Sequence, residues 1–159
     1  MSSASVTFRP ITPDDMPFLY RVYASTRTEE LAPLPWTPEQ VTAFLTMQFN
    51  AQHNYYQQQF PKALYLIILQ GEQAIGRLYR EWRDKDLHVL DISLLPEYRG
   101  KGIGSAILKD LIVEATTAGC GVSIYVEFNN PALRLYERLG FRQISSEGVY
   151  HFMKRPVAG

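Results

Sequence analysis

This sequence of 159 residues has almost no cysteine and no excess of either charge. Cys120 is the single cysteine, which excludes an internal disulfide framework. Sixteen Lys and Arg balance sixteen Asp and Glu. Without a basic excess or a basic run, little is available to neutralise the phosphates of a nucleic acid, so we expect no nucleic-acid partner.

Long apolar runs are also missing. The N-terminal residues show no charged-then-apolar leader, and no later stretch is apolar over the length that a membrane helix needs. We therefore expect a cytoplasmic protein without a membrane partner. The three histidines, His53, His88 and His151, have no metal-ligand spacing, so no metal site is expected. The length suits a single domain, residues 1–159, with a sizeable core.

The most informative stretch is 90–108. Leu90, Ile92 and Leu94 alternate as in a strand, a glycine turn follows, and from Ile107 the apolar residues have helical spacing. Glycines at 100, 102 and 104 allow positive φ and a close approach of the backbone to a ligand. The free amides and the dipole of the helix that follows favour a phosphate group. The pattern predicts a phosphate-bearing cofactor.

Spacing separates three kinds of phosphate loop. A nucleotide-triphosphatase loop needs Ser or Thr directly after Gly-Lys, but Gly102 follows Lys101. The dinucleotide pattern G-x-G-x-x-G would place its third glycine at Ser105, although Glu127 at the end of the next expected strand keeps that interpretation open. The third pattern, R-x-x-G-x-G, is filled by Arg99, Gly102 and Gly104.

A second motif follows about one strand later. It has the form N-x-x-A-x-x-x-Y-x-x-x-G-F and consists here of Asn129, Ala132, Tyr136, Gly140 and Phe141. With both motifs in this order, the region from Leu87 to Phe141 resembles the GNAT superfamily of acyl-CoA-dependent N-acetyltransferases. The resemblance implies acetyl-CoA as co-substrate, with its pyrophosphate on the R-x-x-G-x-G loop.

The order of expected elements agrees with that family. Helix-start signals stand at Thr12 and at Thr37, where Gln40 has capping-box spacing. The expected strands are 6–11, 64–69, 74–82, 87–95, 122–126, 141–144 and 149–153, and the expected helices are 12–25, 37–56, 101–118 and 131–139. The fold class is therefore mixed α/β. We predict a GNAT-type three-layer sandwich with about four helices and a mixed, mostly antiparallel sheet of six to seven strands that includes a splayed strand pair.

The resemblance also assigns a cofactor site. The pantetheine arm would run between the splayed strands, along the backbone of Ile92, Ser93 and Leu94, and Asn129 would lie near it. The pyrophosphate would lie on the loop from Arg99 to Ser105, which comprises Arg99, Gly100, Lys101, Gly102, Ile103, Gly104 and Ser105.

Tyr136 is the predicted general acid, because a phenol near the thioester can protonate the departing thiolate. Its alternative role is that of a buried helix tyrosine packed on Phe141. The base is less defined. Asp91, just before the expected splay, is our candidate, beside a bound water. The other candidates for the general base are Glu81, His88, Glu29 and Glu30.

The region between the first two helices would set acceptor specificity. Glu29 and Glu30 could attract a cationic amine, and Trp36 and Tyr55 belong to an aromatic surface there, unless these aromatic residues only pack the helices on the sheet. The acceptor class stays open between a small-molecule amine, such as a polyamine or an amino-acid-like compound, and a protein amine. A terminal edge strand also leaves a homodimer open.

These observations predict an acetyltransferase in which an amine attacks acetyl-CoA directly. A non-catalytic acyl-CoA-binding sensor is the alternative. A NAD-type dinucleotide-binding domain is less favoured, because an antiparallel meander precedes the loop and few residues follow Glu127.

Overall fold

The computed structural model describes residues 5–128 and 130–157. Within these residues, seven strands form one sheet in the order β1-β2-β3-β4-β5-β7-β6. The strands are β1 (Val6–Pro10), β2 (Leu64–Gln70), β3 (Gln73–Trp82), β4 (Asp86–Leu94), β5 (Gly121–Glu127), β6 (Arg142–Glu147) and β7 (Tyr150–Arg155). Neighbouring strands are antiparallel except β4 and β5, which are parallel because α4 connects them as a crossover.

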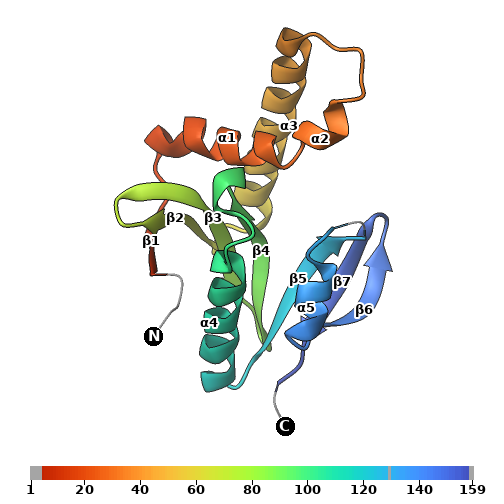
Figure 1. Ribbon diagram of the computed structural model, residues 1–159. Helices are drawn as coiled ribbons and strands as arrows, with labels where there is room; N and C mark the ends of the chain where they lie inside the picture. The colour runs from red at the N-terminus through yellow and green to blue at the C-terminus, as the bar shows by residue number, and fades with distance from the viewer. Residues whose placement is uncertain (1–4, 129, 158–159) are drawn as a thin grey trace.

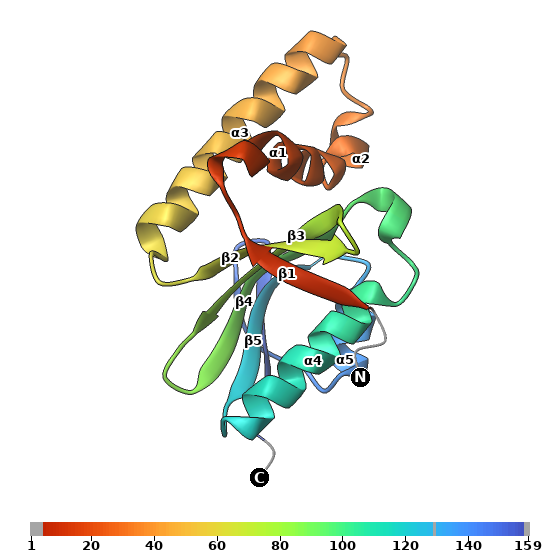
Figure 2. The same ribbon diagram turned by 90° about the vertical axis from the view of Figure 1, so that its left-hand side faces the viewer.

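Helices cover both faces of the sheet (Figures 1 and 2). The helices are α1 (Met16–Ser25), α2 (Thr28–Leu31), α3 (Pro38–Gln59), α4 (Ile103–Thr117) and α5 (Leu133–Arg138), with short 3-10 turns η1 (Pro13–Asp15) and η2 (Pro96–Tyr98). α1 and α3 lie on one face, and α4 and α5 lie on the other. Among the described residues, no helix is both long and apolar enough to cross a bilayer.

Two apolar clusters hold the layers together. The larger packs α4 on the sheet through residues such as Ile107, Leu111 and Val122, and it includes Tyr136 of α5. The smaller packs α1 and α3 on the other face, around Phe49 and Tyr79. The sheet is thus the middle layer of three, and the predicted fold class and its mostly antiparallel sheet are confirmed.

Several local predictions are also confirmed, and others are wrong. Thr37 caps α3, and it forms the expected reciprocal hydrogen bonds with Gln40. The region between the first two expected helices contains the short helix α2, for which no helix was expected and whose N-cap residue, Arg27, makes no side-chain cap. The helix expected from Lys101 begins at Ile103, because Gly102 has the left-handed conformation (φ 81°).

Candidate functional site

β4 and β5 separate halfway along their length. Their parallel pairing runs from Asp86 with Gly121 to Val89 with Ile124 and ends there. Beyond this point β4 continues to Leu94 on β3, while β5 continues to Glu127 on β7. Figure 1 shows the two strands diverging toward the α1 and α2 side of the molecule. We call this divergence the fork.

A β-bulge marks the start of the fork. Tyr79 pairs with Asp91 and Arg80 pairs with Val89, so Leu90 is the extra residue on β4. Further along, the Leu95 amide donates to the Ile75 carbonyl on β3 at 2.9 Å. Successive residues of a strand point their N–H and C=O groups to opposite sides. Leu95 and Ser93 therefore point these groups toward β3, whereas Ile92 and Leu94 point theirs toward the fork. Two of the three predicted pantetheine positions therefore present backbone groups there, and Ser93 presents its backbone to β3.

The glycine loop leads from the outer end of β4 to α4. Gly100 and Gly102 have φ values of 71° and 81°, a region that strains other residues. A Cβ atom added at Gly100, Gly102 or Gly104 would meet nothing within 4 Å. No described side chain caps the first turn of α4. The amides of Ile103, Gly104 and Ser105 thus have no side-chain cap at the positive end of a helix of 15 residues, which fits a pyrophosphate.

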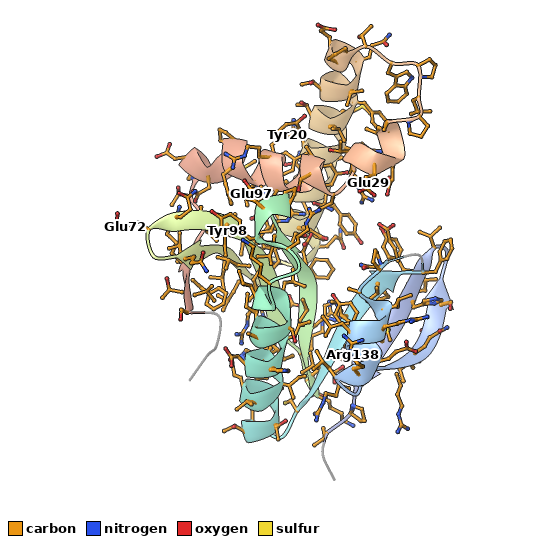
Figure 3. All side chains as sticks on the ribbon, in the orientation of Figure 1. Tyr20, Glu29, Glu72, Glu97, Tyr98 and Arg138 are labelled. Atoms are coloured by element: carbon orange, nitrogen blue, oxygen red, sulfur yellow. The ribbon has the colours of Figure 1, made fainter. Side chains whose placement is uncertain are left out.

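Arg99, predicted as part of the cofactor loop, makes two hydrogen bonds within the protein. Its Nε donates to the Leu94 carbonyl at 2.9 Å, and its Nη2 donates to Ser25 Oγ at 3.0 Å. Figure 3 shows the neighbouring Glu97 and Tyr98 on the turn before α4, close to α1. Arg99 therefore ties the end of β4 to the end of α1. Lys101 is exposed on the same loop.

Tyr136 lies on α5 and is 5% exposed. Its ring packs edge-on against Phe141, with 5.7 Å between centroids. Burial raises the pKa of the Tyr136 hydroxyl to about 12, and the negative charge of Asp91 adds to the rise. A protonated phenol at neutral pH is what a general acid requires. The packing on Phe141 considered from the sequence is thus present, and the role of Tyr136 as general acid stays a prediction.

Asp91 stands at the start of the fork in a network of hydrogen bonds. Arg77 Nη2 donates to Asp91 Oδ2 at 2.6 Å and lies 2.9 Å from Gln52 Oε1 of α3. Ser93 Oγ donates to Asp91 Oδ1 at 2.6 Å. Arg77 is 2% exposed and Asp91 is half-buried. Both carboxylate oxygens of Asp91 are therefore held in place.

The other candidate bases have partners of their own. His88 is buried, and its Nδ1 lies 2.8 Å from Ser123 Oγ. Burial lowers the pKa of the His88 imidazole to about 4, and the Arg83 cation lowers it further, so the ring is neutral at pH 7. Glu81 accepts a hydrogen bond from Arg83 Nε at 3.0 Å.

The four residues predicted for the acceptor do not form one group, because they lie on α2 and near the two ends of α3. Glu29 is exposed on α2 (Figure 3), and Glu30 accepts a hydrogen bond from Arg27 at 3.2 Å. Trp36 packs on Phe44 near the start of α3, whereas the Tyr55 ring lies 6.2 Å from that of Phe60 near its end. At a rise of about 1.5 Å per residue, roughly 25 Å of helix separates Pro38 from Tyr55, so Trp36 and Tyr55 do not share one pocket. Asn129, predicted beside the pantetheine, lies outside the described residues.

Sequence reasoning missed Arg77 and the residues around it. A signal was available, since Arg77 stands inside a strand expected in the middle of the sheet, where a buried charge needs a partner. Its partner Asp91 is 14 residues away in sequence, and only the strand register shows that they meet. Among the described residues, no group of His, Cys, Asp and Glu is arranged to hold a metal ion.

Comparison with known proteins points to one family. Thialysine N-epsilon-acetyltransferase of Sus scrofa is 34% identical over 76 residues, which are 46% of this chain and 45% of that protein. N-alpha-acetyltransferase of Sulfurisphaera tokodaii is 35% identical over 60 residues, 36% of each chain. The chain thus spans less than half the length of these curated relatives.

Solved structures share the whole fold. The PaiA N-acetyltransferase of Thermoplasma acidophilum, solved with coenzyme A, has a TM-score of 0.70 and 19% identity and covers 96% of this chain and 99% of its own. An acetyltransferase of Thermus thermophilus has a TM-score of 0.67 and 22% identity, with 99% and 100% coverage. The model of the acetyltransferase (GNAT) family matches residues 26–141, well over half of the sequence. The chain belongs to the acetyltransferase (GNAT) family.

Proposed function

We propose that this protein transfers an acetyl group from acetyl-CoA to a primary amine of a small molecule or a protein. One observation carries the proposal: the fork between β4 and β5 lies directly beside the uncapped glycine loop at the start of α4. The loop suits the pyrophosphate, and the backbone of Ile92 and the amide of Leu94 suit the pantetheine arm. The thioester would then lie near the start of the fork.

In the proposed reaction, the acceptor nitrogen attacks the thioester carbonyl carbon and the sulfur leaves as a thiolate. Tyr136, whose phenol is protonated at neutral pH, donates its proton to that sulfur. Direct attack is favoured because Cys120 lies beyond the C-terminal end of α4, at the opposite end of that helix from the glycine loop. A covalent acyl-enzyme thus has no cysteine at the fork among the described residues.

Asp91 remains the candidate for handling the acceptor's proton. Arg77 and Ser93 already donate to its two oxygens. A carboxylate held in this way is suited to orient the acceptor ammonium group and a water molecule that removes the ammonium proton. It is less suited to take up that proton itself.

The names of the relatives support an amine as the acceptor, but they do not distinguish a small-molecule amine from a protein amine. Thialysine is a small molecule, whereas the name N-alpha-acetyltransferase refers to an α-amino group. The cytoplasmic location and the homodimer stay predictions from the sequence. A non-catalytic sensor of acyl-CoA would keep the loop and the fork but show no turnover.

Calorimetric titration with acetyl-CoA, with NAD as the control ligand, tests the proposal first. We expect selective binding in the micromolar range, about −8 kcal/mol. A free-thiol release assay with a panel of primary amines follows. Binding of NAD alone would contradict the cofactor assignment, and acetyl-CoA binding without thiol release for any amine would favour the sensor.

A further inference from the structure

The sheet face beside the fork carries an aromatic surface that helices leave open. The α1 and α3 layer packs on β2, β3 and β4, and its cluster contains no described residue of β5, β6 or β7. On this uncovered part, the rings of Tyr125 and Phe152 lie 4.9 Å apart, and the buried His88 ring lies 5.7 Å from Tyr125. Tyr125 is 42% exposed. Ring faces are thus accessible next to the proposed thioester position.

A row of alternating carboxylate and phenol groups crosses the outer end of the same surface. Glu127 of β5 pairs with Tyr150 of β7, and Tyr150 pairs with Glu147 of β6. Directly paired residues lie on the same face with their Cβ atoms about 5 Å apart. Tyr150 is 41% exposed. A ring between two carboxylates attracts a cation both through its face and through the flanking charges.

The charges near this row leave it negative. Arg27 Nη1 donates to Glu127 Oε1 at 3.1 Å and to Glu30 Oε1 at 3.2 Å. Glu147 makes no ion pair with any residue that the structure describes. Arg27 thus divides its charge between Glu127 and Glu30, and Glu147 has its charge available for a ligand.

The distance between the fork and the row is about the length of a short alkyl chain. Tyr125 is the first residue of β5 beyond the last pair with β4, formed by Ile124 and Val89. Glu127 follows two residues later, which is about 7 Å along a strand. A ligand whose reacting amine lies at Tyr125 would place a second group at the Glu127, Tyr150 and Glu147 row, with its alkyl chain over Tyr125 and Phe152.

We propose that the acceptor is a short alkyl diamine, acetylated at the amine in the fork and held by its second ammonium group at the Glu127, Tyr150 and Glu147 row. The inference rests on the proposed acetyl transfer and narrows its acceptor class. In the reaction the new C–N bond forms as the C–S bond breaks, and the attacking nitrogen loses one proton while the thiolate gains one. The second ammonium group takes no part in bond formation.

The test compares putrescine, a diamine, with butylamine, which has the same carbon chain and a single amine. With purified protein and acetyl-CoA, we expect thiol release to give a kcat/KM at least about tenfold higher for putrescine, the size expected for one cation held by a ring and carboxylates. Glu147→Gln and Tyr150→Leu should reduce this ratio about tenfold and threefold, respectively. Tyr150→Phe keeps the ring and should keep most of the ratio.

Glu72→Gln is the matched control, because it removes one carboxylate from the β2–β3 turn, far from the fork (Figure 3). It should leave the ratio unchanged. Equal kcat/KM values for putrescine and butylamine, or variants that lower both alike, would overturn the diamine assignment while leaving acetyl transfer intact. If no amine is turned over, calorimetry of putrescine against the protein saturated with coenzyme A decides: no binding overturns the inference. Failure of coenzyme A itself to bind would instead refute the proposed function.

Discussion

Replacing Arg77 by Met removes the only guanidinium that contacts Asp91 among the described residues. The Arg77 side chain is 3% exposed and that of Asp91 is 14% exposed, so solvent does little to replace the lost partner. Breaking a buried pair from one side leaves an uncompensated charge and costs about 3 kcal/mol. Ser93 still donates to Asp91, which keeps the expected loss near the lower end of the usual range.

A double-mutant cycle measures the interaction directly. We expect Arg77→Met and Asp91→Asn each to lower the free energy of urea unfolding by about 3 kcal/mol, and the double variant to lose much less than the sum. The control is Glu30→Gln, which breaks an exposed pair with Arg27 and should cost under about 0.5 kcal/mol. Additive losses at Arg77 and Asp91, within about 0.5 kcal/mol, would refute the reasoning.

Three further predictions concern the loop, the buried histidine and the proposed acid. Gly102→Ala should destabilise the fold by about 1 kcal/mol, because Gly102 has φ 81°, and should weaken acetyl-CoA binding in calorimetry. Gly102→Asn should lose less stability, because asparagine tolerates this conformation better than alanine. Equal stability of the two variants and the unchanged protein would contradict the argument. His88 has its folded pKa lowered to about 4, so the unfolded chain binds more protons between about pH 6.5 and pH 4, and stability should fall across that window by up to about 3 kcal/mol as the pH falls. The test is urea unfolding at several pH values, in which His88→Phe should lose this slope; a slope that persists in the variant would exclude His88 as its source. Tyr136→Phe should lower kcat at least tenfold with little change in acetyl-CoA affinity, and an unchanged rate would leave Tyr136 with its packing role on Phe141 alone.

Local sequence determined the elements and the cofactor loop. The glycines at 100 and 102 need no distant partner to take positive φ, and the Thr37 and Gln40 signal acts within one helical turn. Alternation and helical spacing are equally local, which is why the strand order along the chain and the family could be inferred from residues alone. The short helix α2 was missed because its four residues make about one turn, which is too short to show helical spacing of apolar residues.

Tertiary structure alone decided which side chains meet at the fork. Arg77 and Asp91 face each other through the β3–β4 register, and the bulge at Leu90 shifts that register by one residue, which sequence periodicity does not reveal. The Glu127, Tyr150 and Glu147 row arises because β7 inserts between β5 and β6, so residues from three strands align across the sheet. The sequence determined which residues could do chemistry, and strand pairing over long separations determined which of them lie together.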